Sequence, residues 1–198
     1  MNRLKGMTAY LCGAMDRVAD GGVEWREHIT PKLQEFGIGV FNPCNKPSDY
    51  APEDEDTREL INSLKRSGRY DEVASVMKPI CAVDLRMVDI AHFIIMNLDI
   101  DSHLCGSYHE AFVAIGQKKP VIVMCKQGKR NLPNWMFGVV PHQMVFVNWS
   151  ETFEYLHHID EDEDVEHLNR WRFFDFNKVY GNDQSTIRPQ ELYESGGD

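Results

Sequence analysis

The sequence predicts an α/β fold with a five-stranded open parallel sheet of flavodoxin-like or Rossmann-like kind. Three observations predict it: short apolar segments rich in Val and Ile, stretches of helical periodicity between them, and glycine or proline at the junctions. Apolar strands that alternate with helices are typical of a parallel sheet covered on both faces. A chain of 198 residues is about one domain long, so one hydrophobic core is expected.

The first part of the expected sheet lies close to the N-terminus. Residues 7–12 form an apolar strand candidate that ends at Gly13. Apolar residues then recur near helical spacing over 23–36, and Gly37 stops this pattern. Residues 38–41 predict a second strand. Strand, helix and strand in this order indicate a right-handed βαβ unit.

The remaining elements follow a polar stretch. Residues 44–79 contain Pro47, Pro52 and an acidic run, and we interpret them as an insertion after the second strand, with helical patterns over 57–65 and 71–77. Beyond it we expect a helix over 81–88, a strand over 91–98, a helix over 106–116, strands over 121–124 and 144–147, and a helix over 151–158. The domain therefore spans 1–159. Residues 160–198 form an acidic and aromatic extension whose cluster at 171–176 is expected to pack on the domain or on a neighbouring subunit.

Composition excludes several classes of function. The formal net charge of −10 argues against binding a nucleic-acid polymer, which requires a basic face. The acidic runs 53–56 and 160–164 are interpreted as solvated surface. The longest apolar run, 90–96, is too short to span a bilayer, and the N-terminus does not resemble a signal peptide. We therefore expect a soluble, cytoplasmic protein without a membrane partner.

Two carboxylates stand out among the candidate functional residues. Asp84 is placed at the start of a helix, and Glu110 in the first turn of the helix over 106–116. A glutamate there is commonly a surface residue, but the helix dipole would also keep a partly buried carboxylate ionised, as a nucleophile toward an anomeric carbon must be. Neither a G-x-G-x-x-G nor a P-loop motif occurs, and the loop bearing Asp99, Asp101, His103 and Cys105 is weak evidence for a metal. No cofactor or metal is expected.

The order of the motifs resembles the nucleoside 2-deoxyribosyltransferase superfamily, which includes deoxynucleoside monophosphate N-glycosidases. The resemblance is carried by AYLCGAM at 9–15, Asp84 ahead of DIAHFII at 89–95, GSYHEA at 106–111, then Gly116 and KPV at 119–121. It covers roughly residues 8–147. Each motif alone is weakly specific, whereas their order and spacing together are more so. The insertion and the extension are not covered.

The resemblance implies roles for individual residues. Glu110 would attack the anomeric carbon, Asp84 would hold or protonate the departing base, and Tyr10 would line the pocket and orient Glu110. Gly13, on a loop similar to the phosphate-side loop of related hydrolases, and Ser107, within the nucleophile motif, are assigned to substrate binding.

Two further assignments depend on loops. The family carries a polar residue that touches the sugar where this chain has Leu104, so Asp101, or Ser102 beside it, would reach the sugar instead. Asn134 and Met136 resemble a segment that completes the pocket of a neighbouring chain, which implies a homo-oligomer with shared active sites. A simple helix cap is an equal explanation for Asn134.

The implied chemistry is cleavage of the N-glycosidic bond of a small (deoxy)nucleoside or nucleotide through a glycosyl-Glu110 intermediate. Displacement by a second base makes the protein a transferase, and displacement by water makes it a hydrolase. One alternative is a (deoxy)nucleoside 5′-monophosphate N-glycosidase, in which Arg17, Lys126, Lys129 and Arg130 are candidate charges for the phosphate. Another is a catalytically inactive nucleotide-binding sensor, which Leu104 favours. A structural protein that docks through its aromatic tail is a weaker alternative.

Overall fold

A computed structural model of the protein describes residues 2–16, 18–47, 50–161 and 168–171. The strands are β1 (Thr8–Gly13), β2 (Gly39–Phe41), β3 (Phe93–Asn97), β4 (Val121–Met124) and β5 (Val145–Phe146). The helices are α1 (Val23–Glu35), α2 (Glu55–Arg66), α3 (Tyr70–Ile90), α4 (Cys105–Gly116), α5 (Asn134–Val139) and α6 (Trp149–Glu161). Short 3₁₀ turns occur at Lys129–Asn131, His142–Met144 and Leu168–Arg170.

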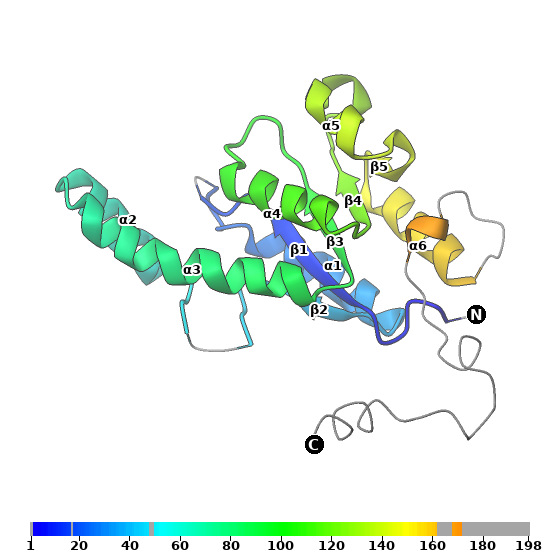
Figure 1. Ribbon diagram of the computed structural model, residues 1–198, viewed down its shortest axis with the longest axis horizontal. Helices are drawn as coiled ribbons and strands as arrows, with labels where there is room; N and C mark the ends of the chain where they lie inside the picture. The colour runs from blue at the N-terminus through cyan, green and yellow to red at the C-terminus, as the bar shows by residue number, and fades with distance from the viewer. Residues whose placement is uncertain (1, 17, 48–49, 162–167, 172–198) are drawn as a thin grey trace, which may run out of the picture.

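The strands form one sheet in the order β2-β1-β3-β4-β5, and every pair in it is parallel (Figure 1). The predicted α/β class with a five-stranded parallel sheet is confirmed. This strand order is that of the flavodoxin-like sheets rather than of the longer dinucleotide-binding sheets. In such sheets, ligands bind beyond the carboxyl ends of the strands, near the point where the strand order reverses, which here lies between β1 and β3.

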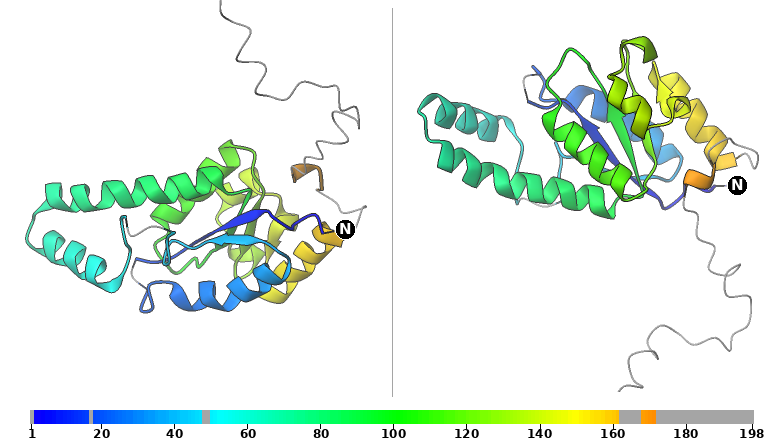
Figure 2. Two further views of the ribbon diagram at one scale, coloured as in Figure 1. Left: turned by 90° about the horizontal axis from the view of Figure 1, so that it is seen from below. Right: turned by 45° about the horizontal axis from the view of Figure 1, so that its top comes forward.

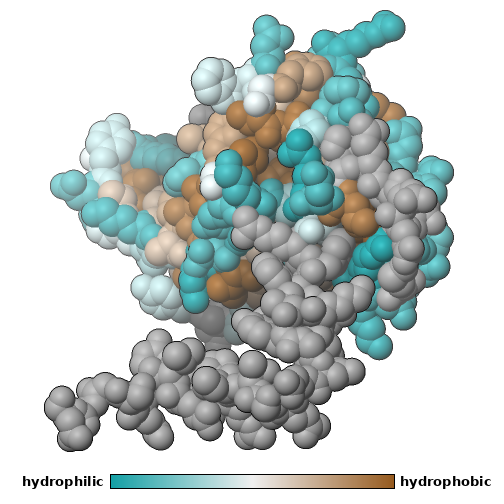
Figure 3. Space-filling model, turned by 45° about the vertical axis from the view of Figure 1, so that its right-hand side comes forward, coloured by the Kyte–Doolittle hydropathy of each residue, from teal (hydrophilic) through white to brown (hydrophobic). Residues whose placement is uncertain are grey.

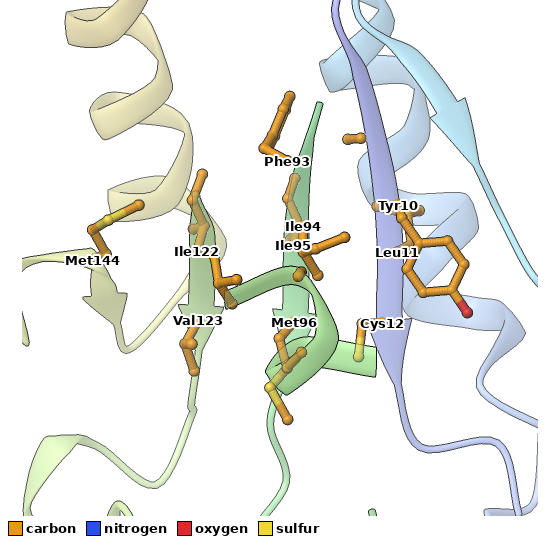
Figure 4. Packing of buried hydrophobic residues seen from close by; sticks show 14 of the residues in the cluster. Tyr10, Leu11, Cys12, Phe93, Ile94, Ile95, Met96, Ile122, Val123 and Met144 are labelled. Carbon is orange, nitrogen blue, oxygen red and sulfur yellow. The ribbon is translucent and has the colours of Figure 1, made fainter. Parts of the chain in front are cut away.

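The sheet is covered on both faces (Figure 2). Helices α3 and α4 lie on one face of the sheet, and α1 and α6 lie on the other. Helix α2 packs against the N-terminal half of α3, and both extend beyond the edge of the sheet. The central strands are fully buried, as the residues from β1, β3 and β4 in Figure 4 illustrate. Trp171, the described member of the aromatic cluster, packs on Phe93 and donates a hydrogen bond to Tyr155. Residues 172–176 of that cluster lie outside the described residues.

Helix α3 differs from the prediction. The sequence predicts a break at Pro79 and a new helix from 81, but α3 continues through Pro79 from Tyr70 to Ile90. Proline removes one intrahelical hydrogen bond, yet Ile80, Met87 and Val88 recur on one side and are buried. Packing of this apolar side outweighs the local cost. The helix thus begins within the segment 44–79 and runs past its end, and Asp84 lies deep inside a helix rather than at its start.

The acidic runs also differ from the prediction of solvated surface. Asp54 is the N-cap of α2 and accepts a hydrogen bond from the Thr57 amide at 2.9 Å, while the neighbouring Glu53 is largely buried. In the second run, Asp160 is buried and accepts from the Leu4 amide at 2.7 Å; residues 162–164 lie outside the described residues. Within the ranges described, no helix combines the length and apolar character that a membrane span requires.

Candidate active site

A cavity of about 520 Å³ opens at the carboxyl ends of β1 and β3. Its walls are the loop after β1, one side of α3 and the beginning of α4. Glu110 and Asp84 both border it, as do Gly13 and Ser107. Its volume falls in the range of roughly 300–1,000 Å³ that is typical of small-molecule sites. The structure therefore brings four of the predicted site residues to one cavity.

Glu110 lies against two side chains of β1. Tyr10 and Cys12 are two residues apart, so they project from the same face of the strand, and Figure 4 shows the Tyr10 ring reaching outward with its hydroxyl at the far end. Both side chains interact with the Glu110 carboxylate and lower its pKa. The Tyr10 hydroxyl has no hydrogen-bond partner of ordinary geometry among the described residues. Catalytic hydrogen bonds are often loose before substrate binds.

The position of Glu110 in α4 differs from the prediction, and so does the cause of its pKa shift. Glu110 is the sixth residue of α4 and lies in its second turn, and the first turn of α4 carries no acidic residue. The helix dipole therefore does not govern its ionisation, because that effect fades within the first turn. Burial raises the pKa of Glu110 above 4.5, and Asp84 raises it further, against the lowering by Cys12 and Tyr10. The pKa of Glu110 therefore lies above that of an ordinary glutamate.

This electrostatic arrangement predicts a shift in pH dependence. If Glu110 is the nucleophile that the resemblance implies, it must be ionised to attack, and activity is expected to fall as pH drops through its pKa. Because Tyr10 lowers that pKa, Tyr10→Phe is expected to move the acid limb of the pH profile of kcat/KM to higher pH. The matched control is Tyr108→Phe, since Tyr108 stacks on Phe112 of the same helix. If the acid limb of the profile does not move in Tyr10→Phe, Tyr10 does not set the pKa of Glu110 and only lines the pocket.

Asp84 is held in a charged cluster. The Lys46 ammonium, on the loop after β2, lies 2.8 Å from Asp84 Oδ1 and 2.7 Å from Glu53 Oε1. It also donates to the Ala51 carbonyl at 3.1 Å. Sequence reasoning missed Lys46 and Glu53. An isolated lysine in a polar segment and a glutamate in an acidic run carry no periodic signal of burial.

A second buried cation stabilises the end of β1. Arg26, from α1, is fully buried and donates to the carbonyls of Leu11 at 3.2 Å, Gly22 at 2.6 Å and Gly13 at 3.1 Å. A Cβ at Gly13 would lie 2.8 Å from the Trp25 ring and 3.1 Å from the Asn97 carbonyl. Glycine is therefore required at position 13 for packing as well as for cavity shape. Arg26 is a further residue that the sequence analysis did not identify.

The loop between β3 and α4 does not follow the prediction for Asp101. Asp101 is exposed and lies outside the cavity, where its carboxylate accepts a hydrogen bond from the Gln127 amide at 3.2 Å. Leu104 borders the cavity and is buried. Ser107 is also buried, and its backbone carbonyl accepts from the Cys12 thiol. Lys126 pairs with Asp99 at 3.4 Å and does not border the cavity.

Asn134 and Met136, which were predicted to complete the pocket of a neighbouring chain, lie in different environments on α5. Asn134 is exposed at the start of α5, and the helix has Pro133 as its N-cap without a side-chain cap, so the helix-cap explanation for Asn134 is wrong. Met136 is fully buried in the core, because α5 turns that side toward the sheet. The prediction that Met136 contacts substrate is therefore contradicted by its burial in this chain. Neither residue borders the Glu110 cavity of its own chain.

Comparison with solved structures identifies the fold. A 2-deoxyribosyltransferase from Bacillus psychrosaccharolyticus superposes with a TM-score of 0.50 at 14% identity, covering 85% of this chain and 99% of that one. A 2-deoxyribosyltransferase from Leishmania mexicana gives a TM-score of 0.47 at 13% identity, covering 76% and 96%. No family model and no curated protein sequence matches the chain. The chain therefore shares the fold of the Bacillus protein.

Proposed function

We propose that this protein is a nucleoside 2-deoxyribosyltransferase that cleaves the N-glycosidic bond of a (deoxy)nucleoside by double displacement at Glu110. The observation that carries the proposal is the pairing of two carboxylates across one cavity. Glu110 is backed by Tyr10 and Cys12, and Asp84 faces the same space from α3. Two carboxylates in different environments are the usual requirement for attack and leaving-group assistance at an anomeric carbon.

The reaction follows from this placement. The Glu110 carboxylate forms a bond to the anomeric carbon as the bond to the base breaks, and Asp84 hydrogen-bonds or protonates the departing base. An incoming base then displaces Glu110 and releases a proton, which regenerates the enzyme. The apolar parts of Met77, Ile80 and Leu85 border the cavity beside Asp84 and provide a surface for a planar base. None of these steps calls for a metal or redox cofactor.

A single incubation series tests the proposal. The protein is incubated with deoxynucleosides, ribonucleosides and deoxynucleoside 5′-monophosphates, each with and without a free acceptor base, and the products are separated by chromatography. Formation of a new nucleoside supports the transferase. Release of base and sugar phosphate alone would indicate the 5′-monophosphate N-glycosidase instead. Binding without turnover would indicate a sensor, which the apolar Leu104 at the cavity wall favours.

We also propose that the protein forms a homo-oligomer in which Asn134 completes a neighbouring active site. Trp135 and Phe137, on the outer side of α5, are 73% and 49% exposed. Figure 3 shows apolar residues gathered on the upper part of the face that carries α5 and α6. Aromatic residues of this kind are enriched in the centres of protein interfaces.

Mixed oligomers test the shared site. Glu110→Ala and Asn134→Ala are each expected to lose activity, and exchange of subunits between them is expected to restore a fraction of it, because some pockets then contain both native residues. The measurement is activity after verified subunit exchange, with each variant treated alone as the control. A monomer by light scattering, or no recovery after exchange, would contradict the proposal.

A further inference from the structure

The Lys46, Glu53 and Asp84 side chains form a nearly dry cluster at the base side of the cavity. Their side chains are 3%, 17% and 9% exposed. Lys46 lies between the two carboxylates, 2.7 Å from Glu53 Oε1 and 2.8 Å from Asp84 Oδ1. Glu53 and Asp84 are also within hydrogen-bonding reach of each other. The cluster joins three segments of chain: the loop after β2, the residue before the α2 N-cap, and α3.

The cluster has one ammonium for two carboxylates. With all three groups ionised it carries a net negative charge in a buried place, and one added proton makes it neutral. Burial and the charge of Asp84 raise the pKa of Glu53 to about 7, although Lys46 acts to lower it. Burial acts to lower the pKa of Lys46, but its hydrogen bonds to Asp84 and Glu53 raise it above 10.5, so Lys46 stays charged. Near neutral pH the exchangeable proton of the cluster therefore belongs to Glu53.

Other titratable groups border the cluster from each neighbouring element. Those in the Glu110 cavity are Asp16, Cys81, His103, Cys105, His109 and Glu110. Those in the adjoining cavity are Asp16, Glu55, Arg58, Glu59 and Lys65. Cys44 also lies near Glu53. Within the described ranges, the direct partners of the Glu53 carboxylate are Lys46 and Asp84 rather than any of these groups. The exchangeable proton is therefore assigned to Glu53, next to Asp84.

Glu53 occupies the boundary between two cavities. The Glu110 cavity and an adjoining cavity of about 410 Å³ share Glu53, together with Met15, Asp16, Met77 and Ile80. A substrate with its anomeric carbon at Glu110 and its base at Asp84 thus has Glu53 immediately behind the base-binding carboxylate.

We propose that Glu53 stores the proton that the departing base takes up, and that Lys46 holds Glu53 and Asp84 together so that this proton passes through Asp84. The inference rests on the proposed function. In the first half-reaction, Glu110 forms a bond to the anomeric carbon, the bond to the base nitrogen breaks, and Asp84 gives a proton to the base and takes one from Glu53. In the second half-reaction, the incoming base loses its N–H proton to Asp84, and Glu53 is protonated again.

The test compares leaving groups in Glu53→Gln. Loss of the stored proton is expected to lower kcat for 2′-deoxyinosine by about 10²-fold, the usual contribution of general acid catalysis. 7-Methyl-2′-deoxyguanosine, whose cationic base leaves without a proton, is expected to react at nearly the wild-type rate. The matched control is Glu59→Gln on α2, an exposed glutamate that borders the adjoining cavity but not the Glu110 cavity. An equal loss for both substrates would overturn the relay and make Glu53 a structural residue.

Thermal unfolding provides a readout that needs no turnover. A carboxyl whose folded-state pKa is raised stabilises the fold while it is protonated, and this contribution is lost as pH rises from the unfolded value near 4.5 to the folded value of about 7. Glutamine does not titrate, so the melting temperature of the wild type is expected to fall relative to that of Glu53→Gln between pH 5 and pH 8. If the difference in melting temperature between the two proteins does not change with pH, Glu53 does not store a proton and the proposal is contradicted. If the pH-dependent difference is present but the wild type converts no nucleoside, the proposed function is contradicted. The proton relay, which depends on that function, is then contradicted as well.

Discussion

Glu110→Ala is expected to lower kcat by at least about 10³-fold, because removal of a covalent nucleophile leaves only binding and leaving-group assistance. The same substitution is expected to leave the fold intact. Burial raises the pKa of Glu110, so the native fold is destabilised by its ionisation as pH rises, and removing the carboxyl relieves that cost. The variant should therefore melt no lower than the wild type at pH 8.

Two measurements check the assignment of Glu110. Mass spectrometry of wild-type protein quenched during turnover is expected to find a deoxyribosyl adduct on the peptide that contains Glu110, and none in the variant. The control is Glu27→Ala, an exposed glutamate on α1 at the opposite face of the sheet, which should retain activity. Wild-type activity in folded Glu110→Ala would remove Glu110 from the mechanism.

Lys46→Met is expected to destabilise the fold by about 3 kcal/mol at pH 8, since it leaves Glu53 and Asp84 buried without their cation. For a chain of this size, that corresponds to a fall in melting temperature of roughly 6–12 °C. Methionine occupies a similar volume, so packing contributes little to the change. Without Lys46, which acts to lower it, the pKa of Glu53 rises further, and the loss of stability should shrink at pH 5, where Glu53 takes up a proton.

The control for Lys46 is a surface ion pair of the same chemistry. Lys32 lies 2.9 Å from Glu35, with side chains 56% and 63% exposed. Lys32→Met is expected to change stability by at most about 0.5 kcal/mol, because exposed pairs are screened by water. Both variants are compared by thermal unfolding at pH 5 and pH 8. Equal small losses for the two lysines would show that the Lys46 cluster contributes no more than a surface pair.

The sequence predicted the architecture well because apolar periodicity reports burial directly. β1, β3 and β4 are continuous apolar segments, and their positions agree with prediction to within two residues at each end. The prediction of a helix break at Pro79 was wrong because it relied on a local rule and not on apolar periodicity. A local rule for proline was applied where the apolar side of α3 packs on the domain, and that packing outweighs the loss of one hydrogen bond. The placement of Asp84 at a helix start was a consequence of this error.

The candidate site was predicted in part. Glu110, Asp84, Gly13 and Ser107 meet at one cavity, with Tyr10 directly behind Glu110. Asp101 and Asn134 lie elsewhere on this chain, and Met136 belongs to the core. Met136 could not be assigned from its motif, because a six-residue helix offers less than two turns of periodicity from which to read the buried side.

By itself the sequence determined which segments form strands and that the sheet is parallel. These properties follow from the spacing of apolar residues along the chain. Only the tertiary structure decided the strand order, the burial of Glu53 and its approach to Lys46 and Asp84. Such charged partners come from segments far apart in the sequence, and a charge buried by its partner is indistinguishable in sequence from a charge in water.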